Sequence, residues 1–240
     1  MGFNPSLGSR KNRKFSLQQF NLNRRHCIAL AIGLIVAGSK AIAVDSAQAL
    51  KPNRKQFTIL VLGDSLSAEY GLQRGVGWVA LLENKLTSEK IVAQVINASI
   101  SGDTTSGGRA RLAGLLTRYQ PGIVVLELGG NDALRGLPMG LTQDNLNAMT
   151  RAAKEAGAKV LLLGMQVPPN YGKVYAAHFF AMFADVAKTH KIRLVPFLLR
   201  GVADVPDSAQ WFQVDRIHPV AAAHPILLAN IWPELKKLLP

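Results

Sequence analysis

The stretch FTILVLGDS, at residues 57–65, decides the fold. Its apolar residues are nearly continuous and do not alternate with polar ones, which is typical of a strand buried on both faces of a parallel sheet. Similar apolar runs recur along the chain at 91–97, 122–130, 159–165 and 192–197. The pattern therefore predicts five parallel strands.

Segments with helical patterning separate these runs. They lie at 76–87, 106–118, 143–157, 174–190 and 220–239. Regular alternation of strand and helix predicts a parallel sheet with right-handed crossovers and with helices on both faces. We therefore expect an α/β fold, a three-layer α/β/α sandwich with a five-stranded parallel sheet that is flavodoxin-like in outline.

Composition is that of one globular domain. The chain has 240 residues, of which 48% are hydrophobic and 18% charged, enough for a core without disulfides. Cys27 is the only cysteine, which excludes a disulfide framework and a cysteine-based metal site. The net charge is +13, but residues 1–43 hold seven basic and no acidic side chains. The rest is mildly basic and has no base-recognition motif, so we expect no nucleic-acid partner.

The N-terminal segment has the features of a secretory signal. Residues 27–38, CIALAIGLIVAG, follow Arg24 and Arg25, and small residues suited to cleavage end at Ala43 and at Ala49. A membrane anchor is the alternative, but a span needs about 20 apolar residues. We expect a signal peptide and short leader at 1–49 and a domain at 50–240.

The expected destination is the periplasm, or the medium outside the cell. Once the leader is removed, we expect no stable membrane insertion. The mature chain would contain no cysteine, which excludes a thiol nucleophile. The Arg24-Arg25 pair leaves the export route open, and either alanine can mark the cleavage site.

Ser65 lies where the first predicted strand must turn sharply, a turn that Gly63 permits. If a helix follows directly, its first N–H groups and its positive dipole end lie beside the hydroxyl. Ser65 can then act as a nucleophile whose own amide helps to hold an oxyanion. A plain helix-capping serine is the alternative, so the assignment depends on partners elsewhere in the chain.

A serine nucleophile needs a histidine base that a carboxylate orients. His218 is preceded by Asp215 three positions earlier. This spacing lets the carboxylate fold back onto the imidazole, provided that Pro219 opens the last helix. An exposed loop histidine is the alternative. The other three histidines of the mature chain have helical surroundings and are interpreted as packing residues: His178, His190 and His224.

Acyl transfer also requires hydrogen-bond donors for the developing oxyanion. Asn131 follows two glycines at a strand end, and Gly102 offers an unshielded backbone N–H. Each such donor contributes about 3 kcal/mol to transition-state stabilisation. Ordinary turns are the alternative interpretation. Three nearby aspartates suggest a metal cluster at first sight, but we expect them to shape the loops: Asp64, Asp103 and Asp132.

Four short blocks resemble the SGNH, or GDSL, hydrolase superfamily. They read GDSLS at 63–67, SGDT at 101–104, GGND at 129–132 and DRIHP at 215–219, in the order typical of that superfamily. The resemblance covers nearly all of residues 57–240. Three longer stretches are similar to the bacterial periplasmic branch of this superfamily, whose members have thioesterase I, lysophospholipase and arylesterase activity. The stretches are NASISGDTTSGG (97–108), LELGGNDALRGL (126–137) and PPNYG (168–172).

The resemblance implies a role for each matched residue. Ser65 would be the nucleophile, with Asp215 and His218 as its relay. The oxyanion hole would consist of the Ser65 N–H, Gly102 and Asn131. The loop that contains Leu134 and Leu137, together with Tyr171, would contact the substrate. Neither a metal nor an organic cofactor is implied. The expected partners are small acyl esters or thioesters, and the expected state is a monomer.

Two positions depart from the pattern of that branch. Glu69 and Arg216 stand where its members commonly have glycine. Glu69 would add negative charge near the cleft, and Arg216 would attract anionic groups beside His218. Two other functions stay open at this point. Related scaffolds act as carbohydrate O-deacetylases, and a secreted binding protein without catalytic activity can keep the same fold.

Overall fold

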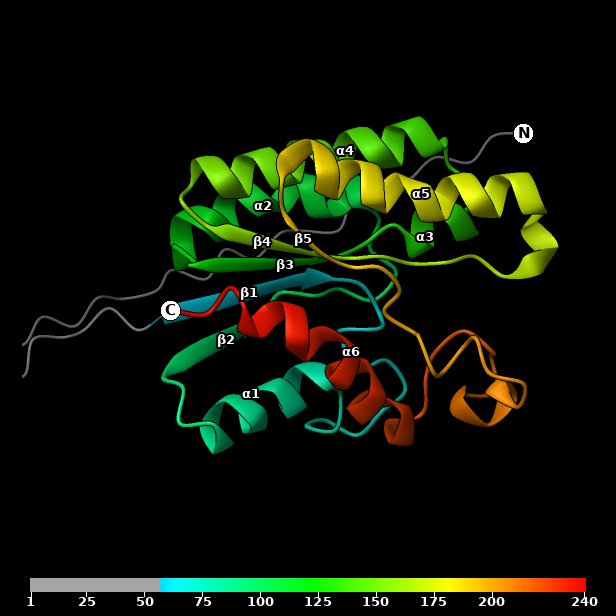
Figure 1. The fold of residues 1–240 in the computed structure, drawn as a ribbon, viewed down its shortest axis with the longest axis horizontal. Helices are drawn as coiled ribbons and strands as arrows, with labels where there is room; N and C mark the ends of the chain where they lie inside the picture. The colour runs from blue at the N-terminus through cyan, green and yellow to red at the C-terminus, as the bar shows by residue number, and fades with distance from the viewer. Residues whose placement is uncertain (1–56) are drawn as a thin grey trace, which may run out of the picture. The chain divides into compact units, whose positions relative to one another are not determined.

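The computed structural model describes residues 57–240 (Figure 1). Its five parallel strands form one sheet in the order β2-β1-β3-β4-β5. They are β1 (Phe57–Gly63), β2 (Ala93–Asn97), β3 (Ile123–Glu127), β4 (Lys159–Leu163) and β5 (Arg193–Val195). The predicted five-stranded parallel sheet is confirmed. The signal peptide predicted at 1–49, with Cys27, lies outside the described residues.

Helices cover both faces of the sheet (Figure 1), so the predicted three-layer sandwich is also confirmed. One face carries α1 (Trp78–Ser88) and α6 (His224–Lys236), which pack on each other. The other carries α2 (Thr105–Tyr119), α4 (Met139–Glu155) and α5 (Lys173–His190). Short helices complete the chain: α3 (Gly130–Leu134), η1 (Pro169–Tyr171), η2 (Ser208–Trp211) and η3 (Ala221–Ala223).

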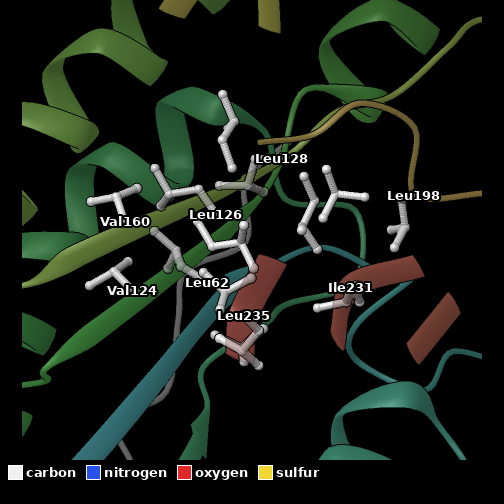
Figure 2. Packing of buried hydrophobic residues seen from close by; sticks show 14 of the residues in the cluster. Leu62, Val124, Leu126, Leu128, Val160, Leu198, Ile231 and Leu235 are labelled. Carbon is white, nitrogen blue, oxygen red and sulfur yellow. The ribbon is translucent and has the colours of Figure 1, made fainter. Parts of the chain in front are cut away.

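The core lies between the three central strands and the helices on each side. Leu62 of β1, Leu126 of β3 and Val160 of β4 are buried in the same hydrophobic cluster as Ile231 and Leu235 of α6 (Figure 2). Burial on both faces explains why these strands have continuous apolar sequences. The same expectation is wrong for 91–97, because β2 is an edge strand. Of its five residues, only Val95 is buried.

Several element boundaries differ from the prediction by a few residues. β3 ends at Glu127 instead of running to residue 130, because Gly129 takes a φ of +119° and α3 begins directly after it. α4 begins at Met139 rather than at 143. Pro219 does not open the last helix, since it forms an isolated antiparallel bridge with Phe212. α6 begins instead at His224, with a proline in its first turn, where no N–H is required.

Within residues 57–240, no helix is both long enough and apolar enough to cross a bilayer.

Candidate active site

The turn after β1 holds Ser65 at the carboxyl edge of the sheet. The carbonyl of Asp64 accepts the amide of Ala68 at 3.0 Å, and Asp64 Oδ1 accepts the amide of Leu66 at 3.0 Å. The expected helix does not follow Ser65 directly, because α1 begins only at Trp78. A helix dipole therefore does not act on the Ser65 hydroxyl, and the turn itself must present both the hydroxyl and the amide.

Gly63 is required for a different reason from the one expected. A Cβ at this position would lie 2.7 Å from Oε2 of Glu127 and 2.8 Å from Oγ of Ser67. Gly63 is not among the glycines with positive φ. Close approach of a neighbouring carboxyl group, and not a left-handed turn, therefore excludes a side chain here.

His218 reaches Ser65 from a loop near the C-terminal end of the chain. Its Nε2 lies 2.8 Å from Ser65 Oγ. The bridge between Phe212 and Pro219 closes this loop, and the amide of Gln213 donates to the carbonyl of His218 at 2.7 Å. The short hairpin-like loop, rather than a helix terminus, thus sets the position of the imidazole.

Asp215 is bonded to the other side of the same imidazole. Its Oδ2 lies 2.6 Å from His218 Nδ1, and its Oδ1 accepts the amides of Ile217 and His218, each at 3.0 Å. The hydrogen bond with His218 lowers the pKa of Asp215 to about 2. An ionised carboxylate therefore faces Nδ1 at neutral pH, which favours a proton on Nδ1 and leaves Nε2 free to accept from Ser65.

Tyr70 is a site residue that sequence reasoning missed. Its ring centroid lies 4.3 Å from that of His218, with 37° between the ring planes. The Gln213 side chain donates to the carbonyls of Tyr70 and Pro219 at 2.9 and 3.1 Å, which joins the turn after Ser65 to the His218 loop. A single aromatic residue in a turn carries no sequence signal for such a contact.

Asn131 and Gly102 belong to the segments that follow β3 and β2. Asn131 lies on α3, and its Nδ2 donates to Asp64 Oδ2 at 3.0 Å. The second N–H of that amide remains available for a ligand. Gly102 has a φ of +78°, and Arg135 donates to its carbonyl at 2.7 Å. Because Arg135 directly follows α3, this bond ties the Gly102 loop to the Asn131 loop.

The nearby aspartates shape the loops, as expected. Asp103 accepts the amide of Thr104 and pairs with Arg111 at 2.7 Å. Asp132 is buried and accepts the amide and hydroxyl of Thr105 at the first turn of α2, at 2.9 and 2.5 Å. Among the described residues, no three His, Cys, Asp or Glu side chains are grouped to hold a metal ion.

The predicted substrate contacts lie at different positions around this edge. Leu134 ends α3 and is exposed, and the amide of Leu137 donates to the carbonyl of Asp132 at 2.9 Å. Tyr171 lies on η1, with its ring centroid 6.0 Å from that of Tyr175 on α5. The two leucines therefore belong to the segment that follows Asn131, whereas the ring contact of Tyr171 is with α5.

Glu69 and Arg216 share one backbone conformation, which glycine adopts easily: both have a φ of +59°. The Glu69 carboxylate accepts the amides of Gly75 and Gly77, at 3.0 and 2.7 Å, so its charge serves the turn before α1. The Arg216 side chain is exposed and makes no hydrogen bond or ion pair with any described residue.

These two positions should respond differently to glycine. A left-handed conformation costs a non-glycine residue about 1–2 kcal/mol. Glycine relieves this cost, but its greater freedom in the unfolded chain offsets part of the gain. We expect Arg216→Gly to change the free energy of unfolding by less than about 1 kcal/mol. Glu69→Gly also removes an acceptor from two amides and should cost about 1–2 kcal/mol. Thermal unfolding of both variants tests this, and equal Tm values would contradict it.

Ser65, His218 and Asp215, joined at the carboxyl edge of a parallel α/β sheet, form the arrangement of a serine hydrolase. The chain belongs to the GDSL-like Lipase/Acylhydrolase family, whose sequence model matches residues 61–226. The resemblance stated from the four sequence blocks is thereby confirmed, and the chain is an enzyme of the GDSL esterase type.

Several relatives are similar over most of their length. The chain is 48% identical to Esterase TesA of Pseudomonas aeruginosa over 206 residues, which is 86% of this chain and 98% of that protein. It is 41% identical over 182 residues to thioesterase 1/protease 1/lysophospholipase L1 of Escherichia coli K12, covering 76% and 85% of the two chains. A crystal structure of TesA superposes with a TM-score of 0.73 at 52% identity, covering 76% of this chain and 99% of that one.

Proposed function

We propose that this protein hydrolyses acyl esters and thioesters through an acyl-enzyme intermediate on Ser65. One observation carries the proposal: the unbroken relay from Ser65 Oγ to His218 Nε2, at 2.8 Å, and from His218 Nδ1 to Asp215 Oδ2, at 2.6 Å. Both distances lie within hydrogen-bond reach, the geometric requirement for a nucleophile, its base and the group that orients the base.

In the first half of the reaction, His218 Nε2 takes the proton of Ser65 as Oγ attacks the substrate carbonyl carbon. The oxyanion accepts hydrogen bonds from the amides of Ser65 and Gly102 and from the Asn131 side chain. The tetrahedral intermediate then collapses, the bond to the leaving oxygen or sulfur breaks, and His218 returns the proton to that atom. The acyl group remains attached to Ser65.

In the second half, a water molecule takes the place of the leaving group. His218 accepts one of its protons while the water oxygen attacks the acyl carbon. The second tetrahedral intermediate releases the carboxylic acid, and the proton on His218 returns to Ser65. Asp215 remains ionised throughout and stabilises the imidazolium that forms in each half. The residues present require no cofactor for any of these steps.

Exposed apolar side chains near the relay support an acyl substrate. Tyr70, Ile100, Leu134 and Ile217 are all exposed and lie in the segments that carry Ser65, Gly102, Asn131 and His218. A hydrocarbon chain that covers these side chains would remove apolar surface from water. The names of the relatives, an esterase and a thioesterase/lysophospholipase, agree with this substrate class.

The proposal is tested with leaderless protein and a panel of substrates. The panel contains p-nitrophenyl esters of increasing chain length, an acyl-CoA, a lysophospholipid and an acetylated sugar. An organophosphonate probe, mapped by mass spectrometry, reports the nucleophile. We expect labelling at Ser65 and a preference for medium or long acyl chains. Strict preference for acetyl groups on sugars would favour an O-deacetylase, and absence of both turnover and labelling would favour a binding protein.

Asp215→Asn should reduce kcat by about 10²-fold. Loss of a deeply buried triad carboxylate costs about 10⁴-fold, because the imidazole then takes the wrong tautomer. The Asp215 side chain is 37% exposed, so water can replace part of its interaction with His218. Steady-state kinetics on a p-nitrophenyl ester measure the loss. Retention of full kcat would show that Asp215 does not orient His218.

We also propose export, on the N-terminal signal pattern at 1–49. Cleavage after Ala43 or Ala49 would give a mature protein that begins at Val44 or Leu50. N-terminal sequencing of enzyme recovered from the periplasm or the medium identifies the site. Enzyme that retains residues 1–43 and stays in the cytoplasm would contradict the proposal.

A further inference from the structure

Glu127 is a buried acid that the mechanism above does not use. It ends β3, is 0% exposed, and stands directly opposite Gly63 in the register of β1 and β3. The carboxyl group therefore lies under the turn that presents Ser65. A side chain of this kind is almost never fully buried unless it is paired or neutral.

The bonds of Glu127 tie it to that turn. Its Oε2 accepts the amide of Asp64 at 3.2 Å and the hydroxyl of Ser67 at 2.7 Å. The Ser67 oxygen in turn accepts the indole N–H of Trp78, at 3.2 Å. The other oxygen, Oε1, is buried and has no hydrogen-bond partner among the described residues.

Asp64 extends this network to the oxyanion hole. Its side chain is buried, with a residue exposure of 2%, and its two oxygens accept the Leu66 amide and the Asn131 side-chain amide, each at 3.0 Å. Glu127, Asp64 and Asn131 therefore form one chain of contacts. It runs from the end of β3, through the turn that holds Ser65, to the proposed oxyanion donor.

Two buried carboxyl groups without a cation cannot both be ionised at low cost. No lysine or arginine of the described residues bonds to either group, and the titratable side chain that faces Asp64 from another loop is His218. Burial raises the pKa of Asp64 to about 6, and burial together with the Asp64 charge raises the pKa of Glu127 well above its usual range.

The proton of the pair belongs on Glu127. Asp64 has an N–H donor on each of its two side-chain oxygens, which stabilises a carboxylate, whereas both donors to Glu127 fall on Oε2 alone. Ionised Glu127 would leave negative charge on the buried Oε1, which has no partner.

We propose that Glu127 is a positioning residue that acts as a neutral acid, holding Asp64 so that Asp64 aims the Asn131 amide at the oxyanion. This inference rests on the proposed function, because it assigns Glu127 a role only through the oxyanion donor. Glu127 touches neither substrate nor the reacting atoms. Its removal should therefore lower kcat and leave KM nearly unchanged, since the oxyanion exists only during the reaction.

The first experiment replaces the acid by a neutral group of the same shape. Glutamine can accept from the Asp64 amide and the Ser67 hydroxyl through its side-chain oxygen, and it carries no charge at any pH. We expect Glu127→Gln to keep kcat within about threefold of the wild type. Glu127→Leu should lower kcat by about 10–100-fold when the rate is divided by the number of active sites titrated with the phosphonate. Its KM should stay within about threefold of the wild-type KM. A loss of more than tenfold in folded Glu127→Gln would overturn the neutral-acid assignment.

A double-mutant cycle then tests whether Glu127 acts through Asn131. Once Asn131→Ala has removed the amide, Glu127→Leu should cost less than about threefold further in kcat. Leu126→Ala is the control, because Leu126 is the preceding residue of β3 and is fully buried. It should destabilise the fold without coupling to Asn131. Independent losses for Glu127→Leu and Asn131→Ala would overturn the proposal, whereas full activity of Asn131→Ala alone would refute the oxyanion hole instead.

A stability measurement keeps the proposal testable even if Glu127→Leu does not fold. With its raised pKa, folded wild type retains a proton that the unfolded chain releases above the usual carboxyl range. Wild-type stability therefore falls as pH rises, whereas glutamine does not titrate. The Tm of Glu127→Gln relative to the wild type should thus increase between about pH 5 and pH 8. A difference that is independent of pH would overturn the neutral-acid assignment.

Discussion

Ser65→Ala is expected to lower kcat by about 10⁴-fold or more while leaving the fold intact. In the proposed mechanism Ser65 Oγ bonds to the acyl group, and no other described side chain is hydrogen-bonded to His218 Nε2. Removal of one oxygen from a half-buried turn residue leaves the bonds of Asp64 to the turn unchanged. Residual rate would come from the oxyanion donors alone.

The measurement is steady-state hydrolysis of a p-nitrophenyl ester by freshly purified protein, with phosphonate labelling in parallel. Ser67→Ala is a suitable control, because Ser67 lies in the same turn but bonds to Glu127 and Trp78 rather than to His218. It should lose far less activity than Ser65→Ala. Undiminished turnover in Ser65→Ala would refute the proposed nucleophile.

His218→Ala should have an effect of similar size, a loss of about 10⁴-fold in kcat. In the proposed mechanism the imidazole is the base in both halves of the reaction. The His218 side chain is only 16% exposed, so its removal leaves a space of imidazole size beside Ser65. Free imidazole added to the assay is expected to restore part of the activity in proportion to its concentration. Ser65→Ala should show no such rescue, because it has lost the nucleophile and not the base.

The two variants together locate the proton transfer. Rescue of His218→Ala alone would identify the missing group as the base between Ser65 and the leaving group. If His218→Ala kept more than a tenth of the wild-type kcat, the hydrogen bonds that join Ser65, His218 and Asp215 would not be the catalytic relay. The turn around Ser65 would then need another base.

Much of the fold was predictable because the signal is local. The apolar runs that became β1, β3 and β4 lack alternation, since helices cover both of their faces. The partial exposure of β2 is not predictable from its sequence, because whether a strand lies at the edge of the sheet depends on the order of the strands and not on its own residues. The start of α6 was missed for a similar reason: Pro219 pairs with Phe212, a contact that spacing along the chain does not reveal.

The candidate site likewise contains residues that the sequence identifies and residues that only the packing reveals. Ser65, Gly102, Asn131 and the Asp215–His218 pair stand in short sequence blocks, each of which combines a turn former with a reactive side chain. Glu127 was hidden inside the apolar run 122–130, where one acid has no visible partner. Tyr70 and Gln213 were missed because their contacts join a turn after β1 to a loop far along the chain.

Residue types and their periodicity thus specified a parallel α/β enzyme and the atoms available for its chemistry, because strand burial and turn chemistry act over a few neighbouring positions. Distances between those atoms, and the burial that keeps Glu127 uncharged, arose only when distant segments packed together. Packing sets them because desolvation and alignment depend on which groups surround an atom in space, and chain order does not determine those surroundings.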